Sequence, residues 1–144
     1  MTVKDRYSGL QTLFKTAYES SCHFLTLLSI AEEENIRLGK QNSYIDLIDA
    51  IRVAQSKQWM NHDFTVTVQG SLDLLKHYTG KKWTRREVKK LPLKIKPNEY
   101  TEVIYKNDST GFKHYRRRYF DTLENSITVR DGYISAYYIY TCEE

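Results

Sequence analysis

The spacing of hydrophobic residues changes from helix-like to strand-like a little after the middle of the chain. Up to about residue 80, apolar positions recur three or four residues apart, which is the spacing of one helix face. This pattern predicts helices over residues 11–16, 22–35 and 72–78, and one from Ser43 to about residue 54. We expect Ser43 and Ser71 to act as N-caps, and Gly39 and Gly80 to stop helices.

Beyond residue 100 the pattern is that of β-strands separated by turns. Strands are predicted over residues 100–105, 112–120, 126–129 and 133–140. Residues 107–111 and the pair Asp131-Gly132 have the composition of turns. Helices followed by antiparallel strands predict an α+β fold, with N-terminal helices packed on a C-terminal antiparallel sheet. With 144 residues, no internal repeat and no long linker, we expect a single domain over residues 1–144.

Composition places the chain among globular proteins. Hydrophobic residues make up 40% and charged residues 28% of the sequence. No apolar run approaches the roughly 20 residues of a membrane span, and the N-terminus does not read as a secretory leader. The two cysteines, Cys22 and Cys142, do not suggest a disulfide framework. We therefore expect a cytoplasmic protein without a membrane partner.

Basic residues gather in two stretches of a chain whose net charge is only +4 and which contains 12 tyrosines. Basic clusters interleaved with aromatic side chains are typical of surfaces that follow a nucleic-acid strand or dock an acidic partner. The other interpretation is a solvated strand face with tyrosines packed on the core. The residues of this predicted binding surface are Lys81, Lys82, Arg85, Arg86, Arg116 and Arg118.

Cys22 stands where a polar segment becomes an apolar helix. Serines precede it, as at a helix N-cap, so we expect the thiol to face the positive end of the helix dipole. That position predicts a lowered pKa and a nucleophilic thiolate. The alternative is a small buried apolar side chain without chemistry.

The segment around residues 112–121 contains a histidine and an aspartate that could act with this thiol. His114 lies in the predicted strand 112–120, and Asp121 follows it. A cysteine opening a helix and a histidine on a later antiparallel strand have the layout of a thiol hydrolase: the imidazole takes the thiol proton and a carboxylate orients the imidazole. We expect the Cys22 helix to be central and its N-terminus to meet the strand that carries His114.

No cofactor or metal is expected. His62 and Asp63, together with Cys22 and His23, match no usual zinc spacing. The chain also has no glycine-rich phosphate loop.

Three short stretches carry a resemblance to a known family. They are residues 22–27 (Cys-His-Phe-Leu-Thr-Leu), 77–83 (His-Tyr-Thr-Gly-Lys-Lys-Trp) and 111–115 (Gly-Phe-Lys-His-Tyr), and the segment 121–134 fits as well. Together they resemble domain of unknown function 261, a family of spirochaete plasmids and phage-like genomes. The resemblance implies a phage- or plasmid-encoded protein with a fold similar to papain-like cysteine peptidases, with Cys22, His114 and Asp121 at the matching positions.

The sequence also departs from an active peptidase. No glutamine lies a few residues before Cys22 to stabilise an oxyanion, Ser21 stands where a glycine is usual, and Asp121 follows His114 closely. Two functions therefore stay open. One is a thiol hydrolase of the peptidase or amidase kind, or a degenerate non-catalytic relative, acting on a peptide or protein. The other is an interaction protein that binds a host protein or nucleic acid through the basic, tyrosine-rich sheet.

Overall fold

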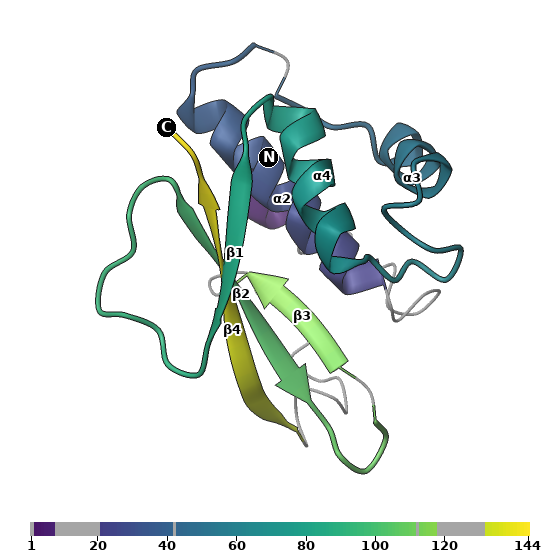
Figure 1. Ribbon diagram of the computed structural model, residues 1–144, viewed down its shortest axis with the longest axis vertical. Helices are drawn as coiled ribbons and strands as arrows, with labels where there is room; N and C mark the ends of the chain where they lie inside the picture. Colours follow the sequence, from purple (N-terminus) through teal and green to yellow (C-terminus); the bar gives the residue numbers. More distant parts are fainter. Residues whose placement is uncertain (1, 8–20, 42, 112, 118–131) are drawn as a thin grey trace.

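A computed structural model describes residues 2–7, 21–41, 43–111, 113–117 and 132–144. Within these ranges it is α+β, as the sequence predicts: helices pack on one face of an antiparallel sheet (Figure 1). The expected helix at 11–16, the expected strand at 126–129, and Arg118, Asp121 and Asp131 lie outside the described residues. In the described part of the chain, no helix is long and apolar enough to cross a membrane.

The helices run α2 (Cys22–Arg37), α3 (Leu47–Ser56) and α4 (Val68–Thr79), after a short helical segment at residues 3–7. Helix α2 is the centre of the molecule, because 13 of its residues are buried. Figure 1 shows α4 beside α2 over one end of the sheet, with α3 farther out. The prediction of a central Cys22 helix is confirmed, and Gly39 follows its end with a left-handed φ of 71°.

Two predicted N-caps are wrong by three or four residues. Helix α3 is capped by Asp46, whose carboxylate accepts from the Asp49 N–H, and not by Ser43. Helix α4 is capped by Thr67, which accepts from the Gly70 N–H, whereas the Ser71 hydroxyl donates back to Val68 inside the helix. Helix α3 therefore begins later than predicted and α4 earlier, and in each case the polar residue directly before the helix accepts from an N–H of the first turn.

The sheet contains four antiparallel strands in the order β1-β4-β2-β3. They are β1 (Trp83–Val88), β2 (Glu99–Lys106), β3 (Lys113–Arg117) and β4 (Tyr133–Cys142). The predicted strands at 100–105, 112–120 and 133–140 are confirmed within the described residues. Strand β1 was not expected as a strand; the last strand, β4, lies between β1 and β2 and pairs with both.

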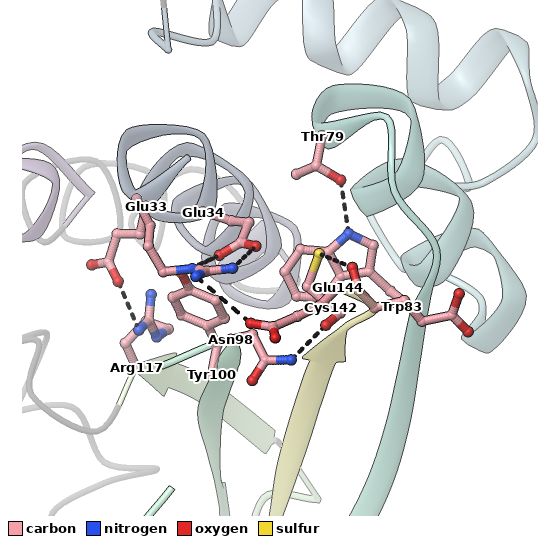
Figure 2. A network of polar contacts seen from close by, with 11 residues as sticks. Glu33, Glu34, Thr79, Trp83, Asn98, Tyr100, Arg117, Cys142 and Glu144 are labelled. Atoms are coloured by element: carbon pink, nitrogen blue, oxygen red, sulfur yellow. Dashed lines mark hydrogen bonds and ion pairs between the residues drawn. The ribbon is translucent and has the colours of Figure 1, made fainter. Parts of the chain in front are cut away.

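One cluster of buried side chains joins the helices to the sheet, from Tyr7 near the N-terminus to Cys142 at the end of β4. A polar network lies at one end of this interface (Figure 2). There Arg37 donates two hydrogen bonds to the fully buried Glu34, and the Tyr100 hydroxyl donates a third. Beside it Arg117 of β3 pairs with Glu33 of α2 at 3.0 Å. These contacts fix β2 and β3 against α2, and so they set the position of the first turn of α2 relative to β3.

Candidate active site

Cys22 is the first residue of α2 and lies against the edge strand β3. Its side chain is only 5% exposed. The backbone N–H of Tyr115 donates to Cys22 Sγ over 3.4 Å. Ser21 stands at the N-cap position of α2, with helical backbone angles and without a side-chain cap hydrogen bond. The thiol therefore sits where the start of the central helix meets the strand that carries His114.

Burial decides the charge state of this thiol. It raises the pKa of Cys22 to about 11. The N–H of Tyr115 acts in the opposite direction, Glu102 raises the pKa further, and the N–H groups of His23 and Cys22 lower it. The stabilisation that we expected at a helix N-terminus is thus present, but desolvation of the thiolate outweighs it. The prediction of a lowered pKa is wrong.

His114 reaches the neighbourhood of Cys22 through its backbone. Its Cα is at most about 6 Å from Cys22 Sγ, because the N–H that contacts the sulfur belongs to the next residue. Alternate residues of a strand project to opposite faces. Tyr115 stacks on His23 of α2 at 4.5 Å and Arg117 pairs with α2, so the His114 side chain leaves β3 on the other face.

There the His114 ring lies beside Tyr105, its partner across the β2–β3 pair, with ring centroids 6.4 Å apart. The side chain is buried, with 4% exposed. The structure therefore brings the backbone of His114 to the thiol, while its imidazole points toward Tyr105. Asp121, the third predicted residue, is outside the described residues.

His23, which the sequence prediction considered only as a metal ligand, follows Cys22 directly and pairs with a buried carboxylate. His23 Nδ1 is 2.7 Å from an oxygen of Glu102, and the Tyr140 hydroxyl donates to the second oxygen over 3.1 Å. Glu102 is fully buried. A carboxylate held in this way fixes the tautomer and orientation of the imidazole. The sequence did contain a signal for this buried carboxylate. By strand alternation Glu102 falls on the same face of β2 as Tyr100 and Ile104, which are buried.

Two aromatic rings, those of Tyr115 and Tyr138, continue from His23 across the inner face of the sheet. The ring of Tyr115 lies 4.5 Å from that of His23 and 6.5 Å from that of Tyr138. The guanidinium carbon of Arg85 lies 4.0 Å above the Tyr138 ring. Tyr115, Tyr138 and Arg85 are each half-buried. We call His23, Tyr115, Tyr138 and Arg85 the aromatic row.

The residues of the predicted binding surface do not lie on one face. Arg85 faces the helices, whereas its neighbour Arg86 points away from them and pairs with Glu99 at 3.0 Å. Arg116 also points away, with its guanidinium 5.1 Å from the Tyr105 ring centre. Lys82 instead lines an open cavity of about 350 Å³ between α4 and β1, and Lys81 is half-buried next to it. Arg118 is outside the described residues.

Among the described residues, no three His, Cys, Asp or Glu side chains converge as they would around a metal ion. Comparison of the chain with protein-family models, with curated proteins and with solved structures finds no match. The structure itself supports the α+β class, and no known protein supports a papain-like fold or an activity for this chain.

Proposed function

We propose that this chain is a thiol hydrolase with a papain-like arrangement, in which Cys22 is the nucleophile, His114 the general base and Asp121 the group that orients the imidazole. One observation carries the proposal: the N–H of Tyr115 contacts Cys22 Sγ at 3.4 Å, so the start of a central helix meets the strand position next to a histidine. Thiol hydrolysis needs the imidazole itself beside the sulfur, so the proposal requires the His114 ring to leave its place beside Tyr105.

The raised pKa determines how such a site would work. At pH 7 a thiol with a pKa of about 11 is ionised in roughly one molecule in ten thousand. A resting thiolate–imidazolium pair is therefore not the ground state in this geometry. His114 instead takes the thiol proton while Sγ attacks the substrate carbonyl carbon. Because the His114 side chain leaves β3 on the opposite face, this step requires the backbone of the edge strand β3 to rearrange, since rotation of the side chain alone does not bring the imidazole to the sulfur.

The remaining steps follow from the same groups. The carbonyl oxygen gains a negative charge, which the Cys22 N–H at the start of α2 can stabilise. The imidazolium gives its proton to the leaving amine as the C–N bond breaks, and a thioester to Cys22 remains. Water, deprotonated by His114, then hydrolyses the thioester and restores the thiol.

Peptide cleavage tests this proposal. We expect the protein to cleave a mixture of peptides detected by mass spectrometry, and Cys22→Ala and His114→Gln to abolish cleavage. Cys142→Ala is the matched control, because its thiol lies in the core at the end of β4 and should be dispensable. A Cys22 that can be acylated without turnover would indicate the degenerate, non-catalytic relative. Cleavage that survives Cys22→Ala would refute the proposal.

A second candidate function is binding of single-stranded nucleic acid or of an acidic host protein. The specific observation is the stack of Arg116 on Tyr105, whose hydroxyl accepts from that guanidinium over 2.7 Å on the face away from the helices. If this face binds phosphates, affinity for an oligonucleotide should fall with salt with a slope of roughly −0.7 per contact. Arg116→Glu together with Arg118→Glu should then abolish binding; an unchanged gel shift would exclude this face.

A further inference from the structure

Within the part of the chain that the structure describes, Arg85 is a half-buried arginine without a carboxylate partner. Five described arginines pair with an aspartate or glutamate: Arg6, Arg37, Arg52, Arg86 and Arg117. Arg85, although half-buried, lies within ion-pair distance of no carboxylate among the described residues. Its contact is the Tyr138 ring, 4.0 Å from the guanidinium carbon.

This environment holds the guanidinium over the Tyr138 ring, and a side-chain hydrogen bond to Tyr140 uses one part of its donor set. A cation over a tyrosine ring is attracted to the π-face, while the five N–H groups of the guanidinium stay in its plane. Arg85 also lies near the Tyr140 hydroxyl: burial raises the pKa of Tyr140 well above its ordinary value, Glu102 adds to this, and Arg85 opposes it. A carboxylate matches such a planar fork with two parallel hydrogen bonds.

The aromatic row connects this guanidinium to the nucleophile. Tyr115, whose N–H contacts Cys22 Sγ, stacks on His23 and faces Tyr138, which lies under Arg85. The successive spacings of the row place Arg85 at most about 15 Å from the His23 ring, which an extended peptide spans in roughly four residues. The rings of Tyr115 and Tyr138 between them are partly exposed, so a peptide that follows this path would lie over them.

We propose that Arg85 binds a carboxylate of the substrate, so that the hydrolase selects peptides with an acidic group within about four residues of the bond that Cys22 attacks; this rests on the function proposed above. The carboxylate belongs to an Asp or Glu side chain or to the peptide C-terminus. Both sources present the same fork of oxygens to the guanidinium.

Two carboxylates of the protein itself, Glu102 and Glu87, lie on the same face of the sheet as Arg85 and affect how strongly it binds an acidic peptide. Glu102 is already engaged by His23 and Tyr140. Glu87 is exposed, lies across from Tyr138 in the β1–β4 pair and shares the face of Arg85. Since Glu87 repels an incoming anion, Glu87→Gln should strengthen the selection of acidic peptides.

The experiment compares two octapeptides that differ only by Glu or Gln three residues from the cleaved bond, each with a free or an amidated C-terminus. For the natural protein we expect kcat/KM to favour the Glu peptide at least tenfold. Arg85→Gln should bring that ratio to about one, and Glu87→Gln should raise it. Arg86→Gln is the matched control: it alters the next residue of the same strand on the opposite face, and the ratio should stay as it is.

A ratio near one for the natural protein, with cleavage intact, would overturn the carboxylate site and leave the proposed function standing. If selection follows the free C-terminus and not the Glu side chain, the terminal carboxylate is the ligand.

Binding of the same peptides to Cys22→Ala, followed by fluorescence anisotropy, separates the two proposals. Arg85-dependent binding without cleavage by the natural protein would support the site and contradict the hydrolase. Loss of oligonucleotide binding in Arg85→Gln, with no effect on peptides, would assign Arg85 to phosphate and overturn the proposal.

Discussion

At the scale of single residues, the competition around Cys22 Sγ governs the chemistry. Three backbone N–H groups favour the thiolate, and burial with the nearby Glu102 favours the thiol. Burial wins and raises the pKa of Cys22 to about 11. The sequence placed this cysteine correctly at the start of a helix, but the depth of its burial depends on β3 and could not be inferred from the neighbouring residues.

The raised pKa of Cys22 predicts a loss of stability in alkali. A folded-state pKa above that of the unfolded chain stabilises the fold at pH values below about 9, and this stabilisation disappears as pH rises through about 11. The difference corresponds to about 3 kcal/mol. Urea unfolding of the natural protein and of Cys22→Ser between pH 7 and 11 measures it, because serine does not ionise and the other groups cancel in the difference. A difference between the two proteins that does not change with pH would show that the thiol titrates normally.

At the scale of elements, the sequence predicted the strands more accurately than the ends of the helices. Alternation correctly predicted β2, β3 and β4, and the turn between β2 and β3 contains Gly111 with φ of 74°. Strand β1 was missed because Trp83–Val88 reads as a basic stretch, and its extended form depends on pairing with β4. The N-caps were missed because serine is as good a capping residue as aspartate or threonine, so the residue types alone did not show that α3 starts after Asp46 and α4 after Thr67.

The start of α4 lies so close to the preceding loop that only a glycine fits. A Cβ at Gly70 would come within 2.3 Å of the Trp59 carbonyl oxygen and 2.6 Å of Thr67 Oγ1. We expect Gly70→Ala to lower the free energy of unfolding by about 2 kcal/mol through this overlap. Gln69→Ala, at the exposed neighbouring position, should stay within about 0.5 kcal/mol. Chemical denaturation checks both variants, and a stable Gly70→Ala would contradict the close approach.

The network around Glu34 gives a second prediction for the contact between α2 and the sheet. Arg37→Met removes the two hydrogen bonds to a fully buried carboxylate and should destabilise the protein strongly. The effect should shrink in acid. Burial raises the pKa of Glu34, but its bonds to Arg37 and Tyr100 outweigh this and lower it, so the stabilisation is lost as pH falls and the carboxyl protonates.

The control for this prediction is Arg52→Met, which breaks an exposed pair with Asp49 at the same three-residue spacing. Thermal unfolding at pH 7 and pH 4 compares them. Equal effects of the two substitutions at pH 7 would show that burial of Glu34 does not matter.

At the scale of the whole molecule, long-range pairing creates the candidate site. The last strand enters the sheet between β1 and β2, and this brings Tyr138 and Tyr140 between Arg85 and Glu102. His23, Glu102 and Arg85 are far apart in the sequence, and no local pattern joins them. Sequence reasoning therefore named Cys22 and His114 as candidates. It could not predict the His23–Glu102 pair, or that Arg85 and Arg86 lie on opposite faces of the sheet.

The central claim is that His114 deprotonates Cys22, and the acylation of Cys22 by p-nitrophenyl acetate tests it most directly. The acetyl group moves to Sγ and nitrophenolate is released, so one absorbance trace gives the rate at each pH. We predict that His114→Gln reacts at least tenfold more slowly than the natural protein at pH 7, and that the rate of the variant rises only as the pH approaches the Cys22 pKa of about 11. Identical pH profiles for the two proteins, with acetyl found on Cys22 in both, would contradict the claim.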